Sequence, residues 1–267
     1  MKNTLGFIGG GNMGKAMIGG ILESKIFAPE NIMVSDLNTD LLNTIEENYG
    51  VKTTKDNNVL VKHSQIIVLA VKPHICDIVI KEIKDKINED AIIVSIAAGK
   101  SIEQIEEDFN KDVKIVRVMP NTPALVGKGM SAISSNNKVS EVELEQIINI
   151  FESFGEVELV DEKLMDVVTG TSGSSPAYVY IFIEAIADGA VLEGMPRDKA
   201  YKMAAQAVLG AAQMVLTTGK HPGELKDMVC SPGGTTIEAV KTLEDKGFRS
   251  AVIEAVRECV KKSRELS

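Results

Sequence analysis

The sequence predicts an α/β fold in which a doubly wound, mainly parallel sheet is followed by an all-helical domain. Three observations lead to this fold class. Short apolar runs alternate with amphipathic stretches over about the first 160 residues, which is typical of βαβ units. A glycine-rich segment, Gly9–Gly14, directly follows the first apolar run. Beyond Pro176 the strand signals disappear, and helix signals continue to the end of the chain.

The expected strands are apolar throughout and rich in β-branched residues, which suits parallel strands covered by helices on both faces. They are Leu5–Ile8, Ile32–Val34, Ile66–Val71, Ala91–Ala97 and Val113–Met119. Amphipathic stretches between them predict helices at Asp40–Tyr49, Ile75–Ile87 and Ile102–Phe109. A last, hairpin-like pair of strands is expected on either side of a helix at Glu141–Phe151, at Met130–Ser134 and Val157–Val160.

The glycine-rich segment fits the pattern G-x-G-x-x-G at Gly9, Gly11 and Gly14, between an expected strand and an expected helix. Such glycines permit a tight turn and a close approach of the backbone to a pyrophosphate, which the helix N-terminus attracts. Asp36 ends the second expected strand, 22 residues after Gly14, where a carboxylate can bind a ribose hydroxyl. A Rossmann-like dinucleotide site is therefore predicted, with a purely structural glycine turn as the alternative. A P-loop is disfavoured because Ala16 has no hydroxyl for Mg²⁺.

Two long, strongly apolar helices are expected after the sheet. The first opens at Pro176, and the second spans Arg197–Leu216. Both helices are apolar on nearly all sides, and their apolar surface is larger than a domain of ~100 residues can bury. We therefore expect a second copy of the chain to cover them. The predicted organisation is a dinucleotide-binding domain in residues 1–162 and a helical dimerisation and substrate-binding domain in residues 163–267.

Composition and charge exclude several classes of protein. With 44% hydrophobic and 25% charged residues, the chain is globular and not disordered. Residues 1–162 carry 16 Lys/Arg against 25 Asp/Glu, and residues 163–267 carry 13 of each, so no basic surface for nucleic acid is expected. Met203–Gly219, a charge-free run of 17 residues, is shorter than the ~20 that a membrane span needs, so no membrane partner is expected.

Cysteine, histidine and tyrosine patterns also narrow the chemistry. The three cysteines lie far apart without a C-x-x-C pair, and the three histidines lack metal-ligand spacing, so we expect no metal site and a reducing, cytoplasmic location. The start of the chain shows no signal-peptide pattern. Neither a G-x-S-x-G nucleophile elbow nor a tyrosine followed four residues later by lysine occurs.

Ser231–Thr236 forms a second motif, in which two glycines and three hydroxyl side chains precede an expected helix. A loop with a helix N-cap would explain one hydroxyl. Two glycines and three hydroxyls in six residues favour a carboxylate cradle, made of exposed backbone N–H groups and side-chain donors.

Seven segments spread along the chain, among them the two glycine-containing motifs above, together resemble a known family. They are Phe7–Gly14, Ala70–Pro73, Met119–Pro123, Gly173–Tyr178, Ala204–Ala212, His221–Asp227 and Ser231–Thr236. Taken together they resemble the pyrroline-5-carboxylate reductase family, which performs the last step of proline biosynthesis, over nearly the whole chain. A homodimer is implied, and a higher homo-oligomer such as a decamer is compatible with the resemblance.

The resemblance also implies site residues. Together with Asp36, the cofactor-binding residues are expected to be Gly9, Gly10, Gly11, Asn12, Met13, Gly14, Ser35, Asn57, Ala70, Val71, Lys72, Pro73, Ala97, Ala98 and Gly99. The substrate-binding residues are expected to be Glu162, Ser231, Gly233, Gly234, Thr235 and Thr236, with the Thr236 hydroxyl as the catalytic group that polarises the ring nitrogen. Met228 stands where some members have a ligand-contacting asparagine, so that contact is absent here.

The implied reaction is hydride transfer from NADPH or NADH to the C=N carbon of 1-pyrroline-5-carboxylate, giving L-proline. Asp36 favours NADH, whereas Ser35 and Asn38 could bind the 2′-phosphate of NADPH, so both cofactors are expected. One alternative is a β-hydroxyacid dehydrogenase, but Pro176–Ala190 lacks the lysine which that class uses as an acid. A non-catalytic dinucleotide sensor is a second alternative, which leaves the motif at Ser231–Thr236 unexplained.

Overall fold

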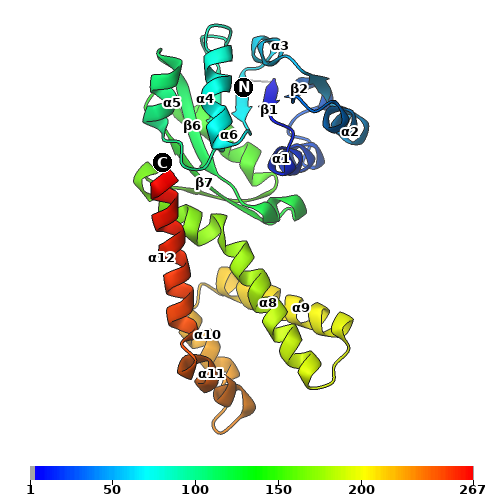
Figure 1. The fold of residues 1–267 in the computed structure, drawn as a ribbon, viewed down its shortest axis with the longest axis vertical. Coiled ribbons are helices and arrows are strands. Elements are labelled where there is room, and N and C mark those ends of the chain that lie inside the picture. The colour runs from blue at the N-terminus through cyan, green and yellow to red at the C-terminus, as the bar shows by residue number, and fades with distance from the viewer. Residues whose placement is uncertain (1–3, 267) are drawn as a thin grey trace. The chain divides into compact units, whose positions relative to one another are not determined.

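The structure, a computed structural model, describes residues 4–266 of the chain, and the side chains of residues 4–265. It divides into two compact units (Figure 1). One unit comprises Met1–Ser174 and Cys259–Ser267, and the other comprises Ser175–Glu258. The domain border expected at residue 162 stays a prediction.

The first unit is built on a mainly parallel sheet, as the sequence predicts. Within the described residues the sheet has eight strands in the order β3-β2-β1-β4-β5-β6-β7-β8. Every neighbouring pair is parallel except β6 and β7. The strands are β1 Leu5–Ile8, β2 Ile32–Ser35, β3 Lys52–Thr54, β4 Ile66–Leu69, β5 Ile92–Ser95, β6 Lys114–Met119, β7 Gly129–Ser135 and β8 Gly155–Leu159.

Helices cover both faces of this sheet, which explains why its central strands are mostly apolar. Alternate residues of one strand enter opposite cores: Val68 of β4 packs in one, and its neighbours Ile67 and Leu69 pack in the other. Side chains of α1 Asn12–Glu23, α2 Thr39–Tyr49 and α6 Glu141–Glu152 fill the first core. Those of α3 Asn57–His63, α4 Pro73–Ile83 and α5 Ile102–Phe109 fill the second.

The hairpin expected at the end of the sheet is wrong in its pairing. β7 pairs antiparallel with β6, and β8 pairs parallel with β7. The reason lies in the connections. A short 3-10 helix, η2 Thr122–Val126, reverses the chain after β6, whereas α6 carries it from β7 to β8. A helical crossover of that length joins parallel strands, and tight reversals join antiparallel ones.

Three helical segments follow the sheet in the same unit. They are η3 Glu162–Leu164, α7 Met165–Val168 and the π-helical turn η4 Thr169–Gly173. The C-terminal end of α12 Phe248–Leu266 packs on them: the Ser263 hydroxyl donates to Asp166 Oδ1 at 2.6 Å, and Cys259 Sγ donates to Ser174 Oγ at 3.3 Å. A π-helical turn often marks a functional site, because it re-aims the side chains of one helical turn.

The second unit is helical and has almost no core of its own. It contains α8 Ser175–Leu192, α9 Arg197–Thr218, α10 Pro222–Val229, α11 Thr235–Asp245 and the first part of α12. Its buried cluster rests on three small residues, Ala187, Ala200 and Ala204. Large apolar side chains of α8 and α9 are instead exposed: Val179, Tyr180, Ile181, Ile186, Leu192, Tyr201, Met203, Leu209, Met214 and Leu216. These two helices therefore present an apolar surface that a single copy of the chain leaves open.

By length and composition alone, the helical stretch Glu162–Leu192 could also cross a membrane, and 6% of its most apolar window is buried. The expectation of no membrane span rests on a different segment, Met203–Gly219, and the stretch Glu162–Leu192 carries Glu162, Lys163, Asp166, Glu184 and Asp188.

Candidate active site

The glycine-rich turn between β1 and α1 is crowded by the protein's own backbone. Gly9 has a φ of +107°, a conformation that side chains other than hydrogen disfavour, and a Cβ there would lie 2.5 Å from the carbonyl oxygen of Ala70. Its N–H donates to the carbonyl of Ser35 at 2.8 Å. A Cβ on Gly14 would lie 2.7 Å from the carbonyl oxygen of Gly9. Close packing of β1, β2, β4 and α1 thus requires these two glycines.

Gly11 differs from its neighbours because the space next to it is open. No atom lies within 4 Å of where its Cβ would stand. Gly11 is the N-cap of α1, no side chain caps this helix end, and no acidic residue occupies its first turn. The first N–H groups of α1, at Asn12 and Met13, are therefore available to an anion, and the helix dipole favours one. These features fit the pyrophosphate of a dinucleotide.

Asp36 braces the same turn. Its Oδ2 accepts from the N–H of Gly10 at 2.9 Å, and its Oδ1 accepts from the N–H of Asn38 at 3.0 Å. The carboxylate is therefore held at the end of β2, beside the turn, where a ribose of the predicted dinucleotide would lie.

Ser35 and Asn57 are tied to each other, and Ser35 is buried. The Ser35 hydroxyl donates to Asn57 Oδ1 at 2.7 Å, while Asn57 Nδ2 donates to Glu82 Oε2 at 2.9 Å. The Ser35 hydroxyl is thus engaged inside the protein, and the exposed Asn38 side chain is the more accessible donor at this end of the turn.

The remaining predicted cofactor residues lie at the carboxyl ends of β4 and β5, where open α/β sheets bind ligands. Ala70–Pro73 leads from β4 into α4, and Ala97–Gly99 leads from β5 toward α5. Both segments border a cleft of about 630 Å³, to which Pro73, Ala98 and Gly99 contribute. The same cleft is lined by residues that sequence reasoning missed: Thr169, Ser174, Cys259, Lys262 and Ser263. Thr169 lies in the π-helical turn, Ser174 directly follows it, and the other three lie on α12, so their proximity shows only in the structure.

Lys100 anchors the loop after β5 to α4 and α5. Its Nζ lies 2.5 Å from Asp77 Oδ1 of α4 and 2.6 Å from Asp108 Oδ2 of α5. Burial lowers the pKa of Lys100, but the hydrogen bonds and charges of Asp108 and Asp77 outweigh it and raise the pKa above its ordinary value. Lys100 is therefore a charged anchor and not a proton donor near neutral pH.

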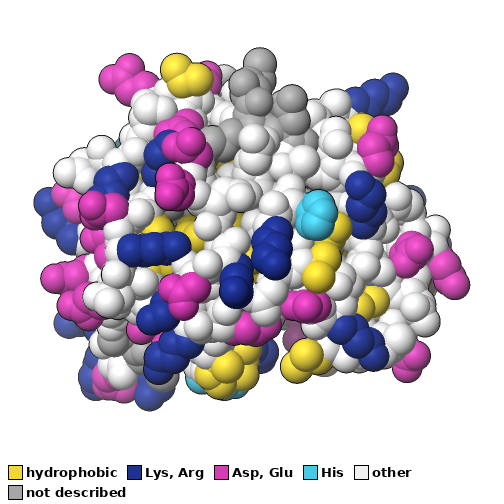
Figure 2. All heavy atoms as spheres, turned by 90° about the horizontal axis from the view of Figure 1, so that it is seen from above, with side chains coloured by type: hydrophobic (Ala, Val, Ile, Leu, Met, Phe, Trp, Pro, Cys, Tyr) yellow, Lys and Arg dark blue, Asp and Glu magenta, His cyan; other side chains and the backbone are white. Residues whose placement is uncertain are grey.

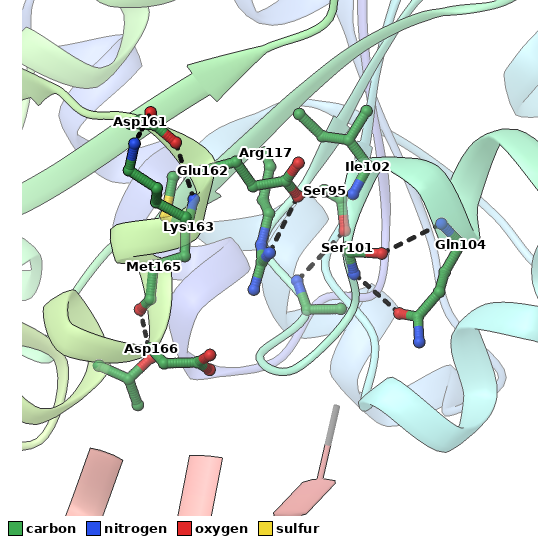
Figure 3. Close-up of polar contacts among 12 residues, drawn as sticks. Ser95, Ser101, Ile102, Gln104, Arg117, Asp161, Glu162, Lys163, Met165 and Asp166 are labelled. Atoms are coloured by element: carbon green, nitrogen blue, oxygen red, sulfur yellow. Dashed lines mark hydrogen bonds and ion pairs between the residues drawn. The ribbon is translucent and has the colours of Figure 1, made fainter. Parts of the chain in front are cut away.

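Glu162 forms a junction between three elements of the first unit (Figure 3). Its Oε1 accepts from the N–H of Ile102, in the first turn of α5, at 2.7 Å and from Nη1 of Arg117, on β6, at 3.0 Å. The Glu162 side chain is about one-third exposed, and that of Arg117 is buried. One carboxylate oxygen is thus engaged structurally.

Asn121, from the motif Met119–Pro123, has a similar bridging role. It is buried, its Nδ2 donates to the carbonyl of Ser172 in the π-helical turn at 3.0 Å, and its Oδ1 accepts from the N–H of Met130 at 2.8 Å. This motif residue therefore holds the π-helical turn against the sheet.

The predicted carboxylate cradle lies in the second unit, at the start of α11. Gly233 has a φ of +67°, and the N–H of Gly234 donates to the carbonyl of Ser231 at 3.0 Å, which closes a tight turn. Gly234 is the N-cap of α11, and no side chain caps this helix. Thr235 and Thr236 follow as its first residues, so their N–H groups are uncapped and their hydroxyls do not cap the helix. This arrangement offers N–H and O–H donors to a carboxylate.

Within the described part of the chain, no group of three or more His, Cys, Asp or Glu side chains is arranged to hold a metal ion. On the face that Figure 2 shows, acidic and basic side chains are interspersed.

Family models and curated proteins match this chain along its length. Residues 162–266 match the family model described as pyrroline-5-carboxylate reductase dimerisation, and residues 4–99 match the model described as NADP oxidoreductase, coenzyme F420-dependent. The pyrroline-5-carboxylate reductase of Escherichia coli strain K12 is 51% identical over 267 residues, covering 100% of this chain and 99% of that protein. The chain belongs to the pyrroline-5-carboxylate reductase family.

Solved structures of the family share the whole fold. The pyrroline-5-carboxylate reductase of Coxiella burnetii has a TM-score of 0.92 at 35% identity and covers 100% of this chain and 98% of its own. The Plasmodium falciparum enzyme, solved with NADP bound, has a TM-score of 0.90 at 35% identity over 98% of this chain and 97% of its own. The predicted fold class and family resemblance are confirmed.

Proposed function

We propose that this chain reduces 1-pyrroline-5-carboxylate to L-proline with NADPH or NADH, as the last step of proline biosynthesis. Full-length identity of 51% to a pyrroline-5-carboxylate reductase carries the choice of substrate. The open space at Gly11, beside the uncapped N-terminus of α1, supports the dinucleotide independently of that likeness. No observation favours the β-hydroxyacid dehydrogenase or the non-catalytic sensor.

The first unit holds the cofactor, which supplies a hydride when bound. Gly9–Gly14 and the α1 N-terminus bind the pyrophosphate, and Asp36 with Asn38 binds the adenosine ribose. Ala70–Pro73 and Ala97–Gly99 line the path toward the reacting end. Ser35 and Asn57 support this region from inside the protein, since their hydrogen bond joins the end of β2 to the start of α3.

The second unit holds the substrate carboxylate on Ser231 and the N–H groups of Gly233–Thr236. Glu162, in the first unit, is a further proposed substrate residue. The hydride adds to the C=N carbon, the π electrons of the C=N bond move to nitrogen, and nitrogen takes a proton. A cyclic imine is basic enough to be protonated in water, so no strong protein acid is required. In the neutral imine the Thr236 hydroxyl donates to the nitrogen and polarises the C=N bond, and once the nitrogen is protonated the same hydroxyl accepts from its N–H. Catalysis then depends on orientation of the reactants within ~3–3.5 Å.

A second copy of the chain covers the exposed apolar surface of α8 and α9, so the protein is a homo-oligomer. We propose a homodimer as the basic unit, with a decamer as a higher assembly that it can build. This use of the apolar surface, together with the dimerisation model matched over residues 162–266, favours a protein partner over a membrane. We place the protein in the cytoplasm, without nucleic-acid partners, and set the domain border at residue 162.

The test is oxidation of NADPH and of NADH, followed by absorbance, with and without 1-pyrroline-5-carboxylate. We expect turnover with both cofactors, dependent on the imine, and L-proline as the product. Cofactor binding without any turnover would support the sensor, and turnover with a β-hydroxyacid alone would support the dehydrogenase.

A further inference from the structure

The loop Ala97–Ser101 connects β5 to α5. It is held by the ion pairs of Lys100 and by hydrogen bonds at its junction with α5. At that junction a capping box is present: the Ser101 hydroxyl accepts from the N–H of Gln104, and the Gln104 side chain accepts from the N–H of Ser101. The next N–H of the same turn, that of Ile102, has no partner in the capping box and donates instead to Glu162 Oε1 at 2.7 Å. Glu162 thus completes the capping of α5 from a segment 60 residues further along the chain.

Arg117 holds the Glu162 carboxylate in place. Its backbone pairs with that of Ser95, the last residue of β5, so it lies two residues before the loop on the neighbouring strand. The residue is only 6% exposed, and its Nη1 donates to the same oxygen of Glu162 at 3.0 Å. Its Nε has no hydrogen-bond partner among the described residues. A buried guanidinium left unpaired is strongly unfavourable, so the pair with Glu162 is firmly held.

Arg117, Glu162 and the Ile102 N–H therefore form a continuous relay from β6 to the start of α5 (Figure 3). We propose that Arg117 is a positioning residue, which sets the loop Ala97–Gly99 through Glu162 so that the loop presents the nicotinamide end of the cofactor to the substrate. This inference rests on the proposed function only for what the loop presents. Arg117 itself is buried and is not among the residues that line the cleft.

Arg117 tests this relay more cleanly than Glu162, because Glu162 is also a proposed substrate residue. In Arg117→Met the long side chain still fills the site but cannot hold the carboxylate. Lys114→Met is the matched control: Lys114 begins the same strand, and its Nζ forms an ion pair with Glu143 Oε1 of α6 at 2.8 Å, away from the loop. Arg117→Lys keeps a cation and serves as the conservative variant. The double variant Arg117→Met/Glu162→Gln removes both charges if the single variant does not fold.

The first measurement, amide hydrogen exchange followed by mass spectrometry on peptides spanning residues 97–104, needs no activity. We expect faster exchange in Arg117→Met, no change in Lys114→Met and partial recovery in Arg117→Lys. The second measures kcat, together with the Kd for NADPH from its fluorescence. We expect kcat to fall about 10- to 100-fold, as it does for misplaced reactants, with the Kd within about threefold of the unchanged protein. A larger isotope effect with NADPH deuterated at the transferred position would accompany the loss.

Unchanged exchange in residues 97–104, or a loss of kcat that Lys114→Met reproduces at equal melting temperature, would overturn the proposal. An unchanged kcat despite faster exchange would also overturn it. If the unsubstituted protein oxidises no NADPH with 1-pyrroline-5-carboxylate, the proposed function fails, while hydrogen exchange still decides whether Arg117 positions the loop.

Discussion

The Thr236 hydroxyl is the group whose removal separates catalysis from folding. Gly234 is the N-cap of α11, and Thr236 is the second residue inside the helix, with no side-chain capping bond. Replacing a β-branched residue by alanine at such a position favours the helix by up to ~0.7 kcal/mol. We therefore expect Thr236→Ala to leave the free energy of unfolding unchanged or slightly higher. A capping role predicts the opposite sign, a loss of about 1 kcal/mol.

Catalysis should change far more than stability in Thr236→Ala. A hydrogen bond to a group that gains or carries charge contributes roughly 1.5–3 kcal/mol, so kcat should fall about 10- to 150-fold while KM changes little. Thr236→Ser keeps the hydroxyl and should keep most activity. Ser231→Ala is the contrasting variant, because Ser231 holds the carboxylate in both ground and transition states and its loss should mainly raise KM. Steady-state kinetics and melting temperatures of these three variants distinguish the catalytic role from the capping role. An intact kcat with a lower melting temperature in Thr236→Ala would refute the proposed role.

Three further outcomes follow from the structure. In Asp36→Ala, the carboxylate beside the ribose is lost, so the ratio of kcat/KM for NADPH to kcat/KM for NADH should rise by about tenfold. The hydrogen bond from the Gly10 N–H is lost as well, so KM should rise for both cofactors. An unchanged ratio would show that Asp36 faces away from the ribose. Sedimentation without detergent at micromolar concentration should give a mass of at least twice 28.8 kDa, and a folded, active monomer would contradict the role of α8 and α9. Burial raises the pKa of the Cys76 thiol to about 11, so Cys76 should resist alkylation at pH 8 until urea unfolds the chain. Since the unfolded thiol ionises nearer its ordinary value, the free energy of unfolding should also fall as pH rises from about 9 to 11, and early alkylation or a flat profile would contradict this burial.

The sequence predicts those parts of the fold whose signal is local. Strands buried on both faces are mostly apolar, so β1, β4, β5 and β6 were recognisable from composition, although β5 ends in Ser95 and β6 contains Lys114 and Arg117. β3 escaped because Lys52–Thr54 is short and polar, and its residues are exposed or half-buried. The direction of β7 and β8 escaped because strand direction depends on the length of each connection, and Met130–Ser134 looks the same in either arrangement.

The same distinction holds at the site. Glycines can be identified from the sequence because the turn restricts each position directly. The partners of Asp36 and Glu162 cannot, because the bonds to Gly10, Arg117 and Ile102 join residues 26, 45 and 60 positions apart. The family resemblance predicts Glu162 near the ligand, but nothing in the sequence indicates that one of its oxygens caps α5. That role becomes visible only when β6 and α5 are folded next to η3.

The glycines in the turn after β1 differ in what makes a side chain unfavourable at each position. Gly9 and Gly14 are required by the protein itself, since a Cβ on each would lie 2.5 Å and 2.7 Å from the backbone oxygens of Ala70 and Gly9 respectively. A Cβ on Gly10 would lie 2.6 Å from the end of the Ile45 side chain, which can shift. A purely structural turn would therefore need Gly9 and Gly14. A Cβ on Gly11 would meet no atom within 4 Å outside its chain neighbours, so packing within the protein does not require glycine there. The alternative of a structural glycine turn therefore leaves Gly11 unexplained, and we predict that at the uncapped start of α1 it lets a pyrophosphate approach the backbone.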